Sequence, residues 1–83
     1  MTQYFVYILY SEGRGKHYVG SCKNTEKRLA QHNTGRVRAT KYGVPWTLIY
    51  REIFDTRQQA YYREHQIKSY KGGEAFRRLL NKS

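Results

Sequence analysis

The sequence predicts a small α+β domain in which helices pack on a three-stranded sheet. Two runs rich in strand-forming residues, 4–10 and 17–22, flank a short glycine-bearing turn, and a third such run covers 46–54. Helical patterns follow the second and the third run, so the predicted order is β-β-α-β-α-α. A hairpin joined by a third strand gives a mixed or an antiparallel sheet.

The first run, Tyr-Phe-Val-Tyr-Ile-Leu-Tyr, is apolar or aromatic on both faces. A strand that is covered on both sides is more often central than at an edge. The turn that follows contains Gly13 and Gly15, which can adopt positive φ, and this favours a hairpin with the second run.

Capping residues mark the first predicted helix. Asn24 or Thr25 can cap a helix that runs to about Asn33 and that Gly35 ends. Residues 34–45 are predicted to form an exposed basic loop, because they combine turn formers with cationic side chains: Gly35, Arg36, Arg38, Lys41, Gly43 and Pro45.

Two further helices are predicted after the third strand. Thr56 and Gln59 fit a capping box, which starts a helix that extends to about Tyr70. The pair Gly72-Gly73 interrupts this helix, and apolar residues at helical spacing predict a last short helix over residues 74–80.

Length and net charge indicate how many domains the chain forms and which class of partner it suits. Its 83 residues suit one domain spanning 1–83, and the net charge is +10, from 16 basic and 6 acidic residues. The basic residues are spread along the chain, which predicts a folded domain with a cationic surface suited to nucleic acid. A basic, soluble surface without a specific partner is the alternative.

Cysteine content and the distribution of apolar residues indicate the cellular compartment. Cys22 is the single cysteine, so an intrachain disulfide cannot form. No run approaches the roughly 20 apolar residues of a membrane span, and the N-terminus reads as a strand rather than a signal peptide. We therefore expect a protein of the reducing cytoplasm that does not bind membranes.

Two tyrosines in the hairpin are candidates for chemistry. If the turn centres between Gly13 and Arg14, Tyr7 pairs with Gly20 and Leu9 pairs with Tyr18. Tyr7 and Tyr18 then share a face as diagonal neighbours, roughly 7–8 Å apart, a gap that a phosphate could bridge. Because tyrosine in a strand usually serves packing, the pair alone is weak evidence for a site.

The next helix adds two groups. Arg28 and His32 are four positions apart and so lie on one helix face. Arginine offers a fork of donors that matches phosphate oxygens, and histidine can accept or relay a proton near neutral pH. Without the tyrosines, a solvated basic face would be the better interpretation.

Glu64 falls on the apolar stripe of its helix, with Ala60 and Ile67. A carboxylate in such a place needs a partner, which can be an arginine, Lys68 one turn on, or a divalent cation with oxygen ligands. The six acidic residues show no local cluster, so a two-metal site is not expected, and a one-metal site held by Glu64 stays open.

Together these residues resemble the GIY-YIG nuclease superfamily, and in particular its small standalone members of uncharacterised function. The resemblance covers about residues 3 to 80. It rests on two triplets, on the helix pair Arg28 and His32, and on Glu64; the triplets are Phe5-Val6-Tyr7 and Tyr18-Val19-Gly20. Two departures stand out: Phe5 replaces the first glycine, and Asn81 is not a clear match to a downstream asparagine of larger members.

The resemblance implies an antiparallel sheet with the first strand in the middle. It also implies metal-assisted hydrolysis of a phosphodiester, with DNA favoured over RNA as the substrate. Glu64 would hold one Mg²⁺ or Mn²⁺ and Arg28 would clamp the phosphate. Tyr7 would orient or deprotonate the attacking water, with a relay through His32, and Tyr18 would hydrogen-bond the phosphate or the water. Since tyrosine has an ordinary pKa near 10, Tyr7 can act as a base only where its pKa is lowered.

Contacts to the nucleic-acid backbone are expected from Arg36, Arg38, Lys41 and Lys68, with little base specificity. Larger family members carry separate targeting domains, so we expect a protein partner for targeting. Two alternatives to an active endonuclease remain: a nucleic-acid-binding module with the nuclease fold and little or no turnover, and a scaffold for an acidic protein partner.

Overall fold

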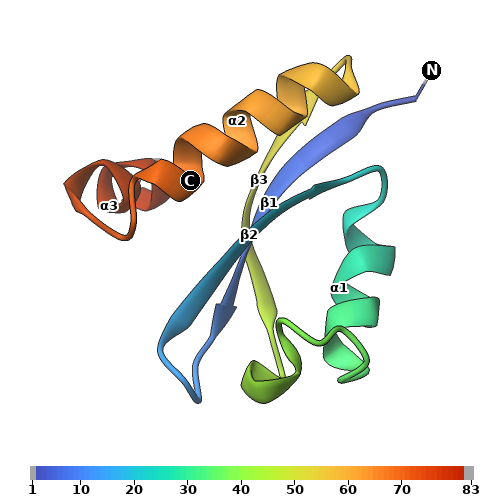
Figure 1. Cartoon of the computed structure of the whole chain (residues 1–83), viewed down its shortest axis with the longest axis vertical. Coiled ribbons are helices and arrows are strands. Elements are labelled where there is room, and N and C mark those ends of the chain that lie inside the picture. Colours follow the sequence, from blue (N-terminus) through green and yellow to red (C-terminus); the bar gives the residue numbers. More distant parts are fainter. Residues whose placement is uncertain (1, 82–83) are drawn as a thin grey trace.

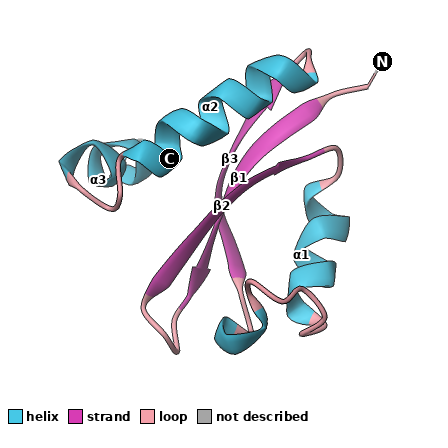
Figure 2. Ribbon diagram, in the orientation of Figure 1, coloured by secondary structure: helices cyan, strands magenta, loops and turns pink. Residues whose placement is uncertain are grey.

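A computed structural model describes residues 2–81 and shows three strands and three α-helices (Figures 1 and 2). Their order along the chain, with one short 3₁₀ helix, is β1 (Tyr4–Ser11), β2 (Lys16–Cys22), α1 (Thr25–Asn33), the 3₁₀ helix η1 (Lys41–Gly43), β3 (Thr47–Phe54), α2 (Arg57–Ser69) and α3 (Glu74–Asn81). This is the predicted β-β-α-β-α-α order of an α+β fold.

The sheet has the strand order β2-β1-β3, and both pairings are antiparallel. The prediction of a central first strand is therefore confirmed, and the mixed-sheet alternative is excluded. The central position explains why β1 is apolar on both faces: Val6, Ile8 and Leu9 are fully buried, and Tyr7 is almost so.

Alternate residues of β1 face two different cores. Val6 and Ile8 pack with Ala60 and Ile67 of α2 and with residues of α3. Tyr7 and Leu9 pack on the other face with Trp46 and with partly buried residues that include Leu29 of α1. Figure 1 shows the same division, with α2 on one side of the sheet and α1 on the other.

Side-chain caps begin both long helices. The side chain of Asn24, rather than that of Thr25, accepts a hydrogen bond from the backbone N–H of Lys27 and so caps α1. At α2 the predicted capping box is present: Thr56 Oγ1 accepts from Gln59 N at 3.1 Å, and Gln59 Oε1 accepts from Thr56 N at 3.2 Å.

The loop over residues 34–45 is not uniformly exposed, which corrects the expectation from sequence. Thr40 and Gly43 are buried, and η1 forms inside the loop. Gly43 lies against Trp46: a Cβ at this position would be 2.5 Å from the indole ring. The loop therefore folds back over Trp46, and this burial carries Thr40 into the core near α1.

Candidate functional site

The hairpin register brings two tyrosines together. Tyr7 pairs with Gly20 and Leu9 with Tyr18, as predicted from the turn. The ring centroids of Tyr7 and Tyr18 are 6.4 Å apart, on the sheet face that α1 covers. The sequence-based geometry of this pair is confirmed, although its role stays a prediction.

Gly20 makes room for the Tyr7 ring. A Cβ on Gly20 would lie 2.5 Å from the Tyr7 hydroxyl oxygen and 2.7 Å from Cζ. Because a real Cβ does not approach that closely, the ring can cross the edge strand β2 only over a glycine. Steric fit thus explains why the second triplet has a glycine at this position. The space above Gly20 lets the Tyr7 hydroxyl extend toward the edge of the sheet.

The Tyr7 hydroxyl is held by a buried chain of hydrogen bonds. It lies 3.0 Å from His32 Nε2, and His32 Nδ1 lies 2.8 Å from Thr40 Oγ1. The Thr40 hydroxyl donates to the carbonyl oxygen of Val37 at 3.5 Å, so it is free to accept from His32 Nδ1–H. In the tautomer with the proton on Nδ1, His32 Nε2 accepts the proton of the Tyr7 hydroxyl.

Sequence reasoning missed Thr40 and Asn33, which support this chain. Trp46 Nε1 donates to the Thr40 carbonyl oxygen at 2.8 Å. Asn33 Oδ1 accepts from Trp46 N at 2.6 Å, and Asn33 Nδ2 donates to Trp46 O at 3.0 Å. No sequence pattern marks either residue, because the contact joins the end of a helix to a loop.

The pKa values of the two buried groups move in opposite directions. Burial raises the pKa of Tyr7 well above its ordinary value, Tyr18 adds to this, and Arg28 opposes it. Burial lowers the pKa of His32, and the Arg28 charge lowers it further. Both groups are therefore neutral near pH 7, and the Tyr7 pKa moves opposite to what a tyrosinate base requires.

Arg28 and His32 share a helix face but differ in exposure. His32 is 1% exposed, whereas Arg28 is exposed. The Arg28 guanidinium forms no salt bridge with any residue in the range 2–81, and it faces a groove of about 470 Å³. An unpaired guanidinium beside Tyr7 and His32 is suited to bind phosphate.

Glu64 is largely buried and bound on both carboxylate oxygens. Lys68 Nζ lies 2.6 Å from Oε2, and the Ser21 hydroxyl donates to Oε1 at 2.6 Å. Burial raises the pKa of Glu64, but the hydrogen bonds from Lys68 and Ser21 outweigh it, and the net pKa lies below the ordinary value. The carboxylate is thus ionised near neutral pH, and its salt-bridge partner is Lys68, one of the alternatives that the sequence left open.

Glu64 and Tyr7 approach the edge strand from opposite faces of the sheet. Ser21, which binds Glu64, pairs with Val6 on the α2 side, whereas Gly20 lies under the Tyr7 ring on the α1 side. Since β2 is an edge strand, the two faces join at Gly20 and Ser21. Arg28 and Ser21, which binds Glu64, line one groove beside this edge. Tyr7, Tyr18, His32 and Glu64 are not among the residues that line it.

The donor set limits the kind of cation that could bind. Within residues 2–81, no group of three or more His, Cys, Asp or Glu side chains is arranged to hold a metal ion. Glu64 offers one carboxylate, and both of its oxygens already have partners, Ser21 and Lys68. A hard cation such as Mg²⁺ commonly keeps several waters and binds one carboxylate plus substrate phosphate. Glu64 could serve as that carboxylate only where Lys68 or Ser21 released one of its oxygens.

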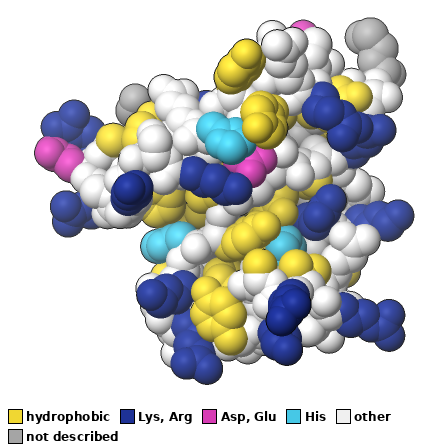
Figure 3. Space-filling view, viewed as in Figure 1, with side chains coloured by type: hydrophobic (Ala, Val, Ile, Leu, Met, Phe, Trp, Pro, Cys, Tyr) yellow, Lys and Arg dark blue, Asp and Glu magenta, His cyan; other side chains and the backbone are white. Residues whose placement is uncertain are grey.

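The residues predicted to contact the nucleic-acid backbone differ in whether they are free to do so. Arg36, Arg38 and Lys41 are exposed, as a contact surface requires, whereas Lys68 is paired with Glu64. Asn81 is exposed at the end of α3. Figure 3 shows Lys and Arg side chains spread around one face of the molecule, with few acidic groups among them.

Comparison with known proteins identifies the class. The chain belongs to the GIY-YIG family, because residues 3–75 match the GIY-YIG catalytic domain. The GIY-YIG domain is of a nuclease type, which suggests nucleic acid as the substrate class. None of the helices within residues 2–81 is long and apolar enough to cross a membrane.

The similar proteins are small members of this family, named UPF0213 proteins. One from Staphylococcus saprophyticus is 38% identical over 71 residues, which are 84% of this chain and 85% of the relative. A relative from Staphylococcus aureus is 37% identical over 71 residues, which again are 84% of this chain and 85% of the relative. The solution NMR structure of a UPF0213 protein from Bacillus halodurans has a TM-score of 0.61 at 22% identity and covers 95% of this chain and 83% of that one, which shows the shared fold.

Proposed function

We propose that this protein is a divalent-metal-dependent endonuclease that hydrolyses phosphodiesters in DNA. The observation that carries the proposal is the arrangement around the edge strand β2. Tyr7, which is paired with His32, lies over Gly20. Glu64 binds Ser21, which lines one groove with the unpaired guanidinium of Arg28. An acceptor for a proton, a clamp for phosphate and a carboxylate for a cation are the parts that such a hydrolysis needs.

The hydrogen-bond direction supports a relay through Tyr7. An attacking water can give its proton to the Tyr7 oxygen while the Tyr7 proton moves to His32 Nε2, so a free tyrosinate is never required. The water oxygen forms a bond to phosphorus, and the phosphorus bond to the leaving oxygen breaks. That oxygen takes a proton from solvent, and His32 returns its proton to solvent, which completes the addition of water.

The other residues bind and orient the substrate. Arg28 would hold a non-bridging oxygen of the scissile phosphate, and Tyr18, packed on His32 with 4.9 Å between centroids, would hydrogen-bond the phosphate or the water. Glu64 would hold Mg²⁺ or Mn²⁺ after Lys68 moves aside. When bound there, the cation supplies stabilisation of the negative charge that develops on the leaving oxygen.

Cleavage assays with matched variants test this proposal. Branched, nicked and single-stranded DNA are incubated with Mg²⁺ or Mn²⁺ and with wild type, Tyr7→Phe, Glu64→Gln or Glu74→Gln. Glu74→Gln is the control, since Glu74 has the same i,i+4 ion pair, with Arg78, but both side chains are exposed. We expect Tyr7→Phe to lose about 100-fold or more, Glu64→Gln to fall to background, and the control to match wild type. Undiminished cutting by Glu64→Gln would refute the metal assignment.

One observation favours a second candidate, a nucleic-acid-binding module with little or no turnover. Both oxygens of Glu64 already have partners inside the protein, which can hold the carboxylate away from a cation. In that case wild type and all three variants bind DNA alike and none cuts it. Freeing the carboxylate with Lys68→Met should then start or increase metal-dependent cutting if the ion pair is what blocks turnover.

The setting of the activity is also part of the proposal. We place one domain, residues 1–83, in the reducing cytoplasm, where the single Cys22 stays a thiol. Exposed Arg36, Arg38 and Lys41 would contact the nucleic-acid backbone without reading bases. A protein partner would then supply targeting, which affinity capture with and without nuclease treatment would test.

A further inference from the structure

A basic surface adjoins the candidate site. Arg28 belongs to both, whereas the other cationic side chains of this surface take no part in the proposed chemistry. It is the groove of about 470 Å³, formed where the end of β2 and the first turns of α1 and α2 meet. Four cationic side chains line it, and no acidic residue does; the four are Lys23, Lys27, Arg28 and Arg57. We call it the basic groove.

The charges of the basic groove are not neutralised by the protein. The salt bridges within residues 2–81 use other basic residues: Arg51, Arg63, Lys68 and Arg78. Four like charges around one hollow repel each other and create a positive potential that an anion would relieve. The two helices that begin here reinforce this potential slightly, but the side-chain charges supply most of it.

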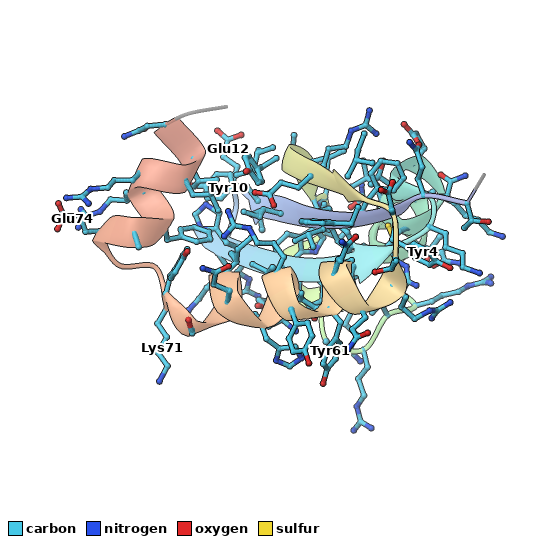
Figure 4. All side chains as sticks on the ribbon, turned by 90° about the horizontal axis from the view of Figure 1, so that it is seen from above. Tyr4, Tyr10, Glu12, Tyr61, Lys71 and Glu74 are labelled. Atoms are coloured by element: carbon cyan, nitrogen blue, oxygen red, sulfur yellow. The ribbon has the colours of Figure 1, made fainter. Side chains whose placement is uncertain are left out.

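Two of these cations are held in place by an aromatic ring. Lys23 Nζ lies 5.8 Å from the ring centroid of Tyr4, and Arg57 Cζ lies 5.5 Å from it. Such cation–π contacts keep both charges over the groove without cancelling them. Figure 4 shows Tyr4 beside the first turns of α2, which is the end of the sheet where these cations converge.

The basic groove is continuous with the candidate site. Arg28 and Ser21 both line it. Ser21 also binds Glu64, and Arg28 acts electrostatically on Tyr7 and His32. A strand whose phosphate reached Arg28 would therefore enter the groove that Lys23 and Arg57 also line.

We propose that the basic groove is a second phosphate subsite, which binds the backbone of the strand adjoining the scissile phosphate. The inference rests on the proposed function, because that function defines where the scissile phosphate lies. The substrate class is then an extended nucleic-acid strand rather than a mononucleotide. The strand would run from Arg28 across Tyr4 to Arg57, bound through charge and not through its base sequence.

Metal-free binding tests this without relying on cleavage. Affinity for a fluorescein-labelled oligothymidylate in EDTA is measured by anisotropy over a range of salt concentrations. The groove variant is Lys23→Gln with Arg57→Gln. The control is Lys16→Gln with Arg77→Gln, which removes the same charge from the start of β2 and from α3. Each lost phosphate contact lowers the salt slope by about 0.7, so we expect about 1.4 less for the groove variant and no change for the control.

Three results would overturn the subsite: equal slopes for the groove variant and wild type, equal losses in both double variants, or no binding by wild type at low salt. An oligoglutamate peptide that binds as tightly as the oligonucleotide would also overturn it, in favour of an acidic protein partner. Amide shifts on titration with the oligonucleotide should cover residues 21–28 and the start of α2. If the groove variant alone loses salt dependence as expected while wild type does not cut DNA, the subsite is supported and the proposed hydrolysis fails.

Discussion

Replacing Gly20 by alanine tests the steric origin of the candidate site. Gly20 is buried, and its φ is not in the left-handed region, so alanine can adopt the backbone conformation. The added Cβ would lie 2.5 Å from the Tyr7 hydroxyl oxygen and 2.7 Å from Cζ, on a ring that is 2% exposed. The ring must therefore move, and its hydrogen bond to His32 must break.

The magnitude follows from two costs. Forcing one carbon into a packed core costs about 1–3 kcal/mol, and leaving a buried hydrogen-bonding group unpaired costs about 1–3 kcal/mol. Since the two overlap when the ring rotates away, we expect a loss of about 2–4 kcal/mol in the free energy of unfolding. For a domain of this size that lowers Tm by roughly 10–30 °C.

Urea and thermal unfolding provide the measurement, with Gly13→Ala as the matched control. Gly13 also lacks positive φ, and a Cβ there would meet nothing within 4 Å, so its replacement should change stability by less than about 1 kcal/mol. In the double variant Gly20→Ala with Tyr7→Phe, the stability losses of the two single variants should not add, because Tyr7→Phe removes the hydroxyl oxygen that lies nearest to the new Cβ. Equal stability of the two alanine variants would show that the Tyr7 ring does not cross Gly20.

Three further predictions concern the hydrogen-bond chain behind Tyr7. Because burial lowers the pKa of His32 below its unfolded value of 6.5, the unfolded chain binds the proton first. The free energy of unfolding should be flat above about pH 7.5 and fall as the pH drops through 6.5. The fall should be smaller in His32→Asn. His17, whose pKa is also lowered, accounts for the fall that remains in this variant. Thr40→Val should cost about 1–3 kcal/mol in urea unfolding, because it leaves His32 Nδ1 unpaired, whereas Thr40→Ser should stay near wild type. Asn33→Ala removes both hydrogen bonds to the Trp46 backbone and should cost about 1–3 kcal/mol, with no effect on the secondary-structure content seen by circular dichroism.

Local signals in the sequence were enough to predict most of the fold. The hairpin register follows from the turn length, and the start of α2 follows from a capping box that involves residues three positions apart. The strand order also follows, because only a central strand needs apolar residues on both faces. Each of these signals depends on neighbours along the chain or on a simple alternation.

The candidate site was predicted as a set of residue types, but its chemistry was not. The sequence alone determined that Tyr7 and Tyr18 share a face and that Glu64 needs a partner. Only the tertiary structure decided that this partner is Lys68 with Ser21, that the basic loop delivers a buried Thr40 to His32, and that burial raises the pKa of Tyr7. The physical reason is that solvation and hydrogen-bond partners depend on segments far apart in sequence, and no periodicity within one element records which of them will meet.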